Sequence, residues 1–263
     1  MDKISIYCLS VNNPERFNEM KDRFEKAGMQ VTFSQDLAIN NIEETKTTTE
    51  PCESIEPPQE NIEIIETTQL AQEEIVSPVH KTTPLKTCTH GHWDFMHEFY
   101  NNSDKEYAIF IEDDVHIYKD FVKIIPHIIE DFNRMNLDIL LLGYLLWENP
   151  SLILGNQFFR PIEKTDFNGK ELTYYTYPCD LWGTQMYMLS RKQVKYFIEE
   201  SIHKDDEKDL AADWLFTKKG VHTALLYPML GVENGKQHYG IWVGQQNLHD
   251  NTHRFNYSEE LYY

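Results

Sequence analysis

Three consecutive acidic residues directly follow an apolar run near the middle of the chain. Ile109 to Ile111 are apolar, and Glu112, Asp113 and Asp114 come immediately after them. Such a run is typical of a buried strand, and open α/β sheets bind their ligands at the carboxyl ends of strands. Because adjacent carboxylates repel one another, we expect a cation here, and Mn²⁺ or Mg²⁺ prefers oxygen ligands of this kind. From the motif alone, an acid-rich helix start explains the residues equally well.

A histidine cluster precedes the acidic motif. His90, His92 and Asp94, with His97 nearby, resemble the start of a metallo-hydrolase motif in which imidazoles bind zinc. Phe95 stands where that motif has its next His, which weakens the hypothesis. Histidines that pack in the core or form hydrogen bonds are the alternative interpretation.

Two later segments could also contribute to a site. Gly183 permits an unusual turn or a close backbone approach, and the residues after it alternate as in a strand. Asp213 lies beside Trp214, and an acid beside an aromatic ring could act as a base near a sugar. An ordinary exposed Asp is the simpler interpretation of this second pair.

The elements that would position these residues alternate between strands and helices. The first 34 residues read as strand, helix and strand. Further strands are expected at 107–111, 138–144, 174–177, 185–189 and 223–227, and helices near 88–100, 119–135, 191–202 and 208–218. Pro126 is expected to begin the second half of the segment 119–135. This alternation predicts an α/β sheet covered by helices on both faces.

The chain is strongly acidic, with 24 Lys and Arg against 43 Asp and Glu and a formal net charge of −19. It therefore lacks the basic field of nucleic-acid-binding proteins and would be repelled by an anionic membrane surface. Ten glutamates lie between Glu43 and Glu74 against the single Lys46, with no aromatic residue among them. We therefore expect a single domain over residues 1–263 that contains a flexible acidic insertion at 42–84.

Targeting segments, membrane-spanning segments and the spacing of the cysteines indicate the cellular compartment. The sequence has no stretch with the features of a signal peptide or a transmembrane helix. Its cysteines are widely spaced and form no CxxC pair: Cys8, Cys52, Cys88 and Cys179. We expect free thiols, a cytoplasmic location and no membrane span.

The order of the motifs resembles glycosyltransferase family 25, which includes lipopolysaccharide-type and collagen-type galactosyltransferases. The matching segments are Ile6 to Ser10, Glu15-Arg16, Cys88 to His92, Ile111 to Val115, Asp138 to Gly143 and Gly183 to Ser190. They cover residues 3–34 and roughly 86–232. The chain departs from the family pattern at Gly91, where the family has a Ser before its His.

This resemblance implies a GT-A-like fold, which is a Rossmann-type mixed sheet flanked by helices. It implies inverting, Mn²⁺- or Mg²⁺-dependent transfer of galactose or glucose from a UDP-sugar to a hydroxyl of a glycan, lipid-linked saccharide or protein. The implied metal ligands are Asp113, Asp114 and His238, and the base is Asp213 or, as second choice, Asp180. The implied nucleotide-sugar contacts are Asn12, Arg16, His92, Glu112, Asp113, Gly183 and Thr184.

Two other functions remain open at this point, and the oligomeric state is open as well. One is a metallo-hydrolase that uses His90, His92 and Asp94. The other is a non-catalytic relative of the glycosyltransferases that binds a partner through its acidic insertion.

Overall fold

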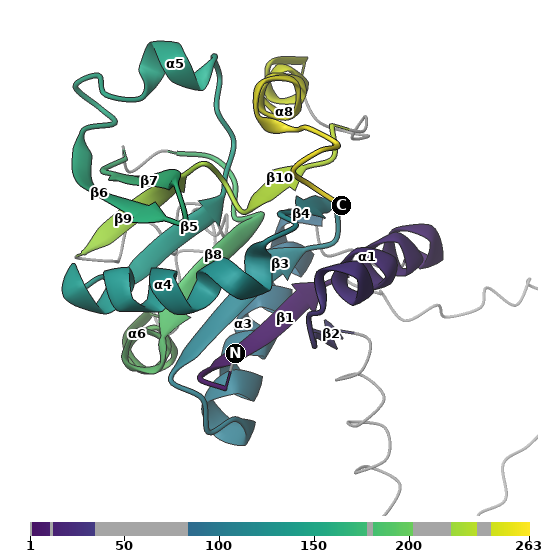
Figure 1. Cartoon of the computed structure of the whole chain (residues 1–263). Helices are drawn as coiled ribbons and strands as arrows, with labels where there is room; N and C mark the ends of the chain where they lie inside the picture. The colour runs from purple at the N-terminus through teal and green to yellow at the C-terminus, as the bar shows by residue number, and fades with distance from the viewer. Residues whose placement is uncertain (1, 11–12, 35–83, 178–180, 202–221, 236–242) are drawn as a thin grey trace, which may run out of the picture.

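A computed structural model of the chain describes residues 2–10, 13–34, 84–177, 181–201, 222–235 and 243–263. Apart from its last residue, the predicted acidic insertion lies outside these ranges. The described residues form a large mixed sheet with helices on both faces (Figure 1). This arrangement confirms the predicted fold class.

The main sheet has eight strands in the part of the chain that the structure describes, in the order β2-β1-β3-β8-β5-β9-β7-β6. The strand bounds are β1 (Ile4–Leu9), β2 (Thr32–Phe33), β3 (Tyr107–Glu112), β5 (Ile139–Gly143), β6 (Pro161–Phe167), β7 (Lys170–Tyr175), β8 (Met186–Ser190) and β9 (Thr223–Tyr227). A separate antiparallel ribbon pairs β4 (Val115–Ile117) with β10 (Gly231–Glu233). The helices are α1 (Pro14–Ala27), α3 (Pro84–Asn102), α4 (Phe121–Arg134), α5 (Pro150–Ile153), α6 (Arg191–Tyr196), its π-helical continuation η1 (Phe197–Ser201) and α8 (Val243–Asn256).

Strand directions bring three chain segments to one edge of the sheet. β1 and β3 are parallel, and Leu9 at the end of β1 pairs with Glu112 at the end of β3. β8 runs antiparallel to β3, with Met186 opposite Ile111, so β8 begins at the edge where β3 ends. Residues that follow β1 and β3 therefore meet residues that precede β8.

Side-chain alternation along the strands assigns each residue to one of two helical layers. Tyr7 and Phe110 point to the same face, with ring centroids 5.7 Å apart, and Tyr7 lies 5.1 Å from Phe95 of α3. On the opposite face, the ring of Tyr107 packs 5.8 Å from Phe132 of α4. Figure 1 accordingly shows α4 in front of the sheet and α3 behind it.

Helix α4 differs from the prediction made for Pro126. It runs without a break from Phe121 to Arg134 and contains Pro126 in its interior, so the prediction that Pro126 begins a second half is wrong. A proline inside a helix costs about 3 kcal/mol, whereas burying one large apolar side chain contributes roughly 1.5–3 kcal/mol. Pro126 is exposed, and the apolar stripe that outweighs its cost comprises Phe121, Ile124, Ile125, Ile128, Ile129 and Phe132.

The buried face of α4 also carries a carboxylate, Asp131, which is 3% exposed. It accepts hydrogen bonds from Arg134 at 2.6 Å, from the Tyr174 hydroxyl at 2.7 Å and from the Thr165 hydroxyl at 2.8 Å. Burial acts to raise the pKa of Asp131, but the hydrogen bonds from Arg134, Tyr174 and Thr165 together lower it below its usual value. The carboxylate thus connects α4 to β6 and β7.

We expect Asp131→Asn to lower the free energy of unfolding by about 3 kcal/mol at pH 7, because the buried Tyr174 hydroxyl and the partly exposed Thr165 and Arg134 lose a charged acceptor. The folded-state pKa of Asp131 lies below its unfolded value of about 3.9, so its stabilisation is present above that pH and is lost as the pH falls. Urea unfolding at neutral and acidic pH should therefore show a difference that shrinks below about pH 4.

The exposed neighbour Glu130 supplies the control. Glu130→Gln should change the free energy of unfolding by no more than about 0.5 kcal/mol. An Asp131→Asn variant as stable as the wild type at pH 7 would contradict the assigned network.

Candidate functional site

The three consecutive acids point in different directions because β3 ends at Glu112. Alternation places the Glu112 side chain on the face toward α3, whereas Asp113 and Asp114 form the turn into β4 and meet α1. The Arg16 guanidinium forms an ion pair with Asp113, and its Nη2 lies 2.9 Å from Oδ2 of Asp114. The side chains of Asp113 and Asp114 are only 2% and 7% exposed, so Arg16 binds two buried carboxylates.

The start of α1 positions Arg16. Asn13 caps this helix, and its side chain accepts hydrogen bonds from the backbone N–H groups of Glu15 at 3.0 Å and Arg16 at 3.2 Å. Pro14 occupies the first turn, where its missing N–H and fixed φ suit a helix start. Because α1 begins just after β1 ends, its first turn lies at the edge that holds the acids.

A further buried carboxylate lies at this edge in the described part of the chain. Glu233 of β10 is 1% exposed, and it pairs with Val115 in the β4–β10 ribbon directly after Asp114. Burial, with the charges of Glu112 and Glu233, raises the pKa of Asp114 to about 7 in spite of Arg16. The donors of Asp113 and Asp114 are carboxylate oxygens, the ligand type that a hard divalent cation such as Mn²⁺ or Mg²⁺ prefers.

Glu112 has its own partners on the α3 side of the sheet. Its Oε1 accepts a hydrogen bond from the Thr184 hydroxyl at 2.9 Å and lies 3.4 Å from Nε2 of His92 and 3.9 Å from Sγ of Cys88. Burial acts to raise the pKa of Glu112, but the interactions with His92 and Thr184 outweigh it and lower the pKa. The structure thus brings together His92, Glu112 and Thr184 from three separate segments.

The backbone conformation and close packing at position 183 require a glycine. Gly183 has a φ of +102°, and a β-carbon would lie 2.8 Å from the backbone nitrogen of Leu145. A larger residue would thus be both strained and too close to its neighbour. The close backbone approach expected at Gly183 is present, and the next residue, Thr184, donates a hydrogen bond to Glu112.

Helix α3 separates the residues of the metallo-hydrolase hypothesis. His92 is completely buried, and its Nδ1 lies 3.0 Å from the Tyr187 hydroxyl. His90 and Asp94 are exposed to solvent instead. The structure therefore does not bring His90, His92 and Asp94 together as ligands of one ion.

Four predicted site residues lie outside the described ranges: Asn12, Asp180, Asp213 and His238. Two residues found here were not predicted as site residues. Glu233 belongs to no motif, and only the pairing of β10 with β4 brings it to the acids. Cys88 lies four residues before His92, a spacing that places both on one helix face and could have identified the pair.

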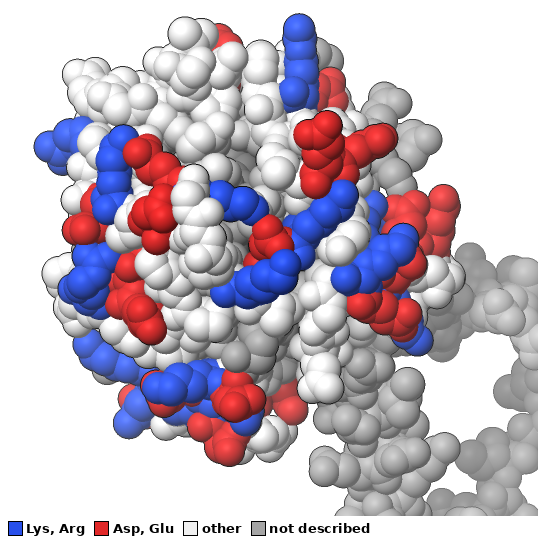
Figure 2. All heavy atoms as spheres, in the orientation of Figure 1, with Lys and Arg blue, Asp and Glu red and all other residues white. Residues whose placement is uncertain are grey.

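Asp113, Asp114 and Glu233 are buried and Glu112 is partly buried, so the acids of the site are distinct from the exposed charges on the surface. On the face drawn in Figure 2, Lys and Arg side chains lie among Asp and Glu side chains, and neither sign occupies that whole face. No helix in the described ranges has the length and apolar character needed to cross a membrane.

Arg16→Gln should lower the free energy of unfolding by about 3–5 kcal/mol, because it leaves Asp113 and Asp114 buried without their guanidinium partner. Urea denaturation in metal-free buffer measures this loss. Arg160→Gln removes an exposed arginine and should be neutral within about 0.5 kcal/mol. Equal stability of Arg16→Gln and the wild type would show that Arg16 does not compensate the two acids.

The chain was also compared with known proteins. No curated protein matches it. Among solved structures, it is similar to the crystal structure of A197 from STIV with a TM-score of 0.40 and 12% identity, over 89% of this chain and 91% of that chain. The model of glycosyltransferase family 25 (LPS biosynthesis protein) matches residues 3–214, which include Arg16, Glu112 to Asp114 and Thr184. The chain therefore belongs to glycosyltransferase family 25 and is a glycosyltransferase.

Proposed function

We propose that this glycosyltransferase transfers galactose or glucose from a UDP-sugar to a hydroxyl of a glycan, lipid-linked saccharide or protein, with inversion at the anomeric carbon and with Mn²⁺ or Mg²⁺ bound. The observation that supports the proposal is the buried pair Asp113 and Asp114 at the carboxyl edge of β3. This edge is where α/β sheets bind nucleotides.

Asp113 and Asp114 would hold the metal ion, and Asp114 is the stronger candidate. Burial is the main cause of its raised pKa, and the negative charges of Glu112 and Glu233 raise it further in spite of Arg16. When bound, the ion stabilises the charge that develops on the diphosphate leaving group. His238, which lies outside the described residues, is proposed as an additional ligand.

The first turn of α1 is the proposed anchor for the diphosphate. The helix dipole favours anions at a helix N-terminus, while the N–H groups of Glu15 and Arg16 already donate to the Asn13 side chain. Asn12 lies just before this turn, and Arg16 lies within it. In this proposal Arg16 orients both carboxylates toward the metal, while Thr184 fixes Glu112 across the edge.

Inversion requires a base on the face of the sugar opposite the leaving UDP. The base removes the proton of the acceptor hydroxyl while its oxygen attacks the anomeric carbon. Asp213 is the first candidate for this role and Asp180 the second, and both lie outside the described residues. Gly183 and Thr184 are proposed to border the donor near Asp180.

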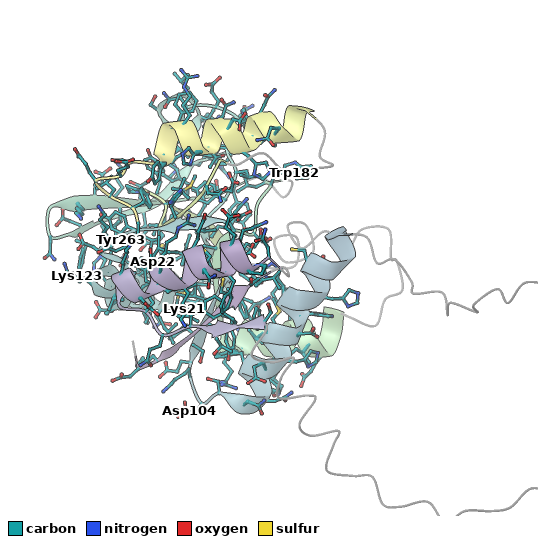
Figure 3. All side chains as sticks on the ribbon, turned by 90° about the vertical axis from the view of Figure 1, so that its right-hand side faces the viewer. Lys21, Asp22, Asp104, Lys123, Trp182 and Tyr263 are labelled. Atoms are coloured by element: carbon teal, nitrogen blue, oxygen red, sulfur yellow. The ribbon has the colours of Figure 1, made fainter. Side chains whose placement is uncertain are left out.

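Asp114→Asn should weaken UDP binding in the presence of Mn²⁺ by about 100-fold, because a bound metal contributes several kcal/mol to binding the diphosphate. Isothermal titration calorimetry with and without Mn²⁺ measures this change. The control is Asp104→Asn, an exposed carboxylate before β3 that should leave binding unchanged. Figure 3 labels Asp104 at the opposite end of the molecule from Trp182, which lies near Thr184 in the sequence.

The reaction itself is tested with UDP-galactose and UDP-glucose. Donor hydrolysis or transfer should depend on Mn²⁺ or Mg²⁺, and NMR of the product should show the opposite anomeric configuration from the donor. A protein that neither binds UDP nor hydrolyses or transfers either sugar would overturn the proposal.

Asp213→Asn should lower kcat by about 10²–10⁴-fold, the usual contribution of a general base, while UDP binding stays unchanged. Asp180→Asn should have a smaller effect on kcat. Initial rates with saturating donor, combined with UDP titrations of each variant, separate loss of the base from loss of binding. If Asp180→Asn shows the larger kcat effect with intact UDP binding, the two roles must be exchanged.

A further inference from the structure

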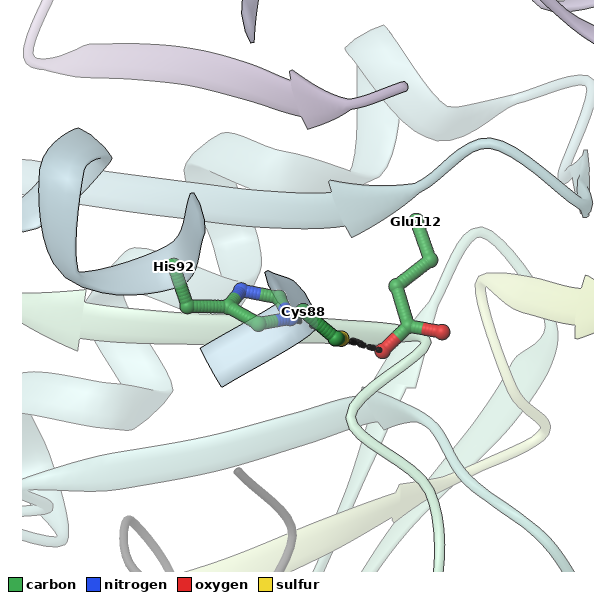
Figure 4. A group of neighbouring side chains, drawn as sticks. All are labelled: Cys88, His92 and Glu112. Carbon is green, nitrogen blue, oxygen red and sulfur yellow. Dashed lines mark hydrogen bonds and ion pairs between the residues drawn. The ribbon is translucent and has the colours of Figure 1, made fainter. Parts of the chain in front are cut away.

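A second cluster of potential ligands lies on the other side of β3 from Arg16. Cys88 and His92 reach from α3 toward the Glu112 carboxylate at the end of β3 (Figure 4). The Cys88 sulfur, a ring nitrogen of His92 and a carboxylate oxygen of Glu112 all lie within 4.8 Å of one another. These are a thiol, an imidazole and a carboxylate, which together form a donor set different from that of Asp113 and Asp114.

The local fold brings the three side chains together for simple reasons. Cys88 and His92 are one helical turn apart, so they share a face of α3. Alternation along β3 places Glu112 on the face that Phe110 presents to α3. Gly91 lets this part of α3 approach the sheet closely, because a β-carbon there would lie 2.3 Å from the side chain of Leu9.

The separations suit ligands around one small cation better than a direct hydrogen bond. Tetrahedral zinc with ordinary bond lengths places its nitrogen and oxygen ligands ~3.3 Å apart and its sulfur and oxygen ligands ~3.5 Å apart. The corresponding distances are 3.4 Å from His92 Nε2 to Glu112 Oε1 and 3.9 Å from Cys88 Sγ to the same oxygen. A hydrogen bond from an imidazole to a carboxylate is normally shorter, at about 2.7–2.9 Å.

Two of the proposed ligands, His92 and Glu112, have hydrogen-bond partners that orient them. Nδ1 of the completely buried His92 lies 3.0 Å from the hydroxyl of Tyr187, which can fix the ring while Nε2 faces the ion. Thr184 donates to Oε1 of Glu112 at 2.9 Å and orients the carboxylate. Such outer partners are typical of metal-binding histidines and carboxylates.

The charge and softness of the donors select the metal. A thiolate and a carboxylate together neutralise one divalent cation, which suits a partly buried position such as this one. Thiolate and imidazole ligands favour zinc, whereas Mn²⁺ and Mg²⁺ favour sites made of oxygen ligands. We propose that Cys88, His92 and Glu112 bind a zinc ion, with a fourth position open to water, and that this ion ties α3 to the end of β3. This site does not depend on the proposed sugar-transfer reaction.

The test uses the whole wild-type chain. It is produced in cells grown with added zinc and is purified without metal-affinity resin. Elemental analysis should find about one zinc ion per chain. Replacement of zinc by Co²⁺ should produce the near-ultraviolet thiolate-to-cobalt absorption band. Cys88→Ser and His92→Gln should each abolish this band, and Tyr187→Phe should weaken zinc binding by about 10–100-fold. His90→Gln changes an exposed histidine of the same helix and should leave the zinc content unchanged.

A measurement on the wild type alone covers the case in which the variants do not fold. Zinc should slow the alkylation of Cys88 by iodoacetamide at least about tenfold, as measured by peptide mass mapping, because a metal-bound thiolate is shielded. An unchanged alkylation rate would overturn the proposal. Absence of both zinc and the cobalt band from the wild type would do so too, as would a cobalt band that persists in a folded Cys88→Ser variant.

Discussion

Adjacent carboxylates at the end of a buried strand repel one another unless neighbouring elements supply compensating groups, and this requirement organises the edge of the sheet. Glu112 is compensated from α3 and from the segment before β8, through His92 and Thr184. Asp113 and Asp114 are compensated from α1, through Arg16. Because each compensating group comes from a different part of the chain, the acids can be buried only when α1, α3 and β8 converge at this edge.

Burial, together with the charges of Glu112 and Glu233, raises the pKa of Asp114 in spite of Arg16, and this bears on the chemistry. In the proposed reaction, a diphosphate approaching Asp113, Asp114 and Glu233 would meet carboxylates of its own sign, which favours binding together with a cation. A divalent cation reverses the local sign and allows carboxylates and phosphates to share one ion. The overall charge of −19 therefore argues against nucleic acid without arguing against a nucleotide, since the relevant charge is the local one.

Sequence patterns predicted the elements better than they predicted the contacts between them. Apolar runs and turn residues were sufficient for β1, α1, β3 and β9, because periodicity is a local property. The ribbon of β4 and β10 was not predicted, since each strand has three residues and is defined by its partner. Glu233 reaches the acids only through that ribbon, so no local pattern indicates its role. Pro126 was misread because the packing of α4, which a local rule does not include, decides whether the helix continues.

The two-residue period of a strand separates two kinds of chemistry at neighbouring positions. Glu112 faces α3, where a thiol and an imidazole offer soft ligands, whereas Asp113, in the turn that follows, shares Arg16 of α1 with the carboxylate of Asp114. Soft ligands hold zinc tightly, while Mn²⁺ and Mg²⁺ bound by one or two carboxylates depend on substrate phosphates for the rest of their coordination. In the proposed arrangement, therefore, the ion on the α3 side stays bound and fixes the end of β3, and the ion on the α1 side binds together with the nucleotide. The proposed ion on the α1 side would benefit from a fixed end of β3. Its two carboxylates, Asp113 and Asp114, lie in the turn that directly follows Glu112.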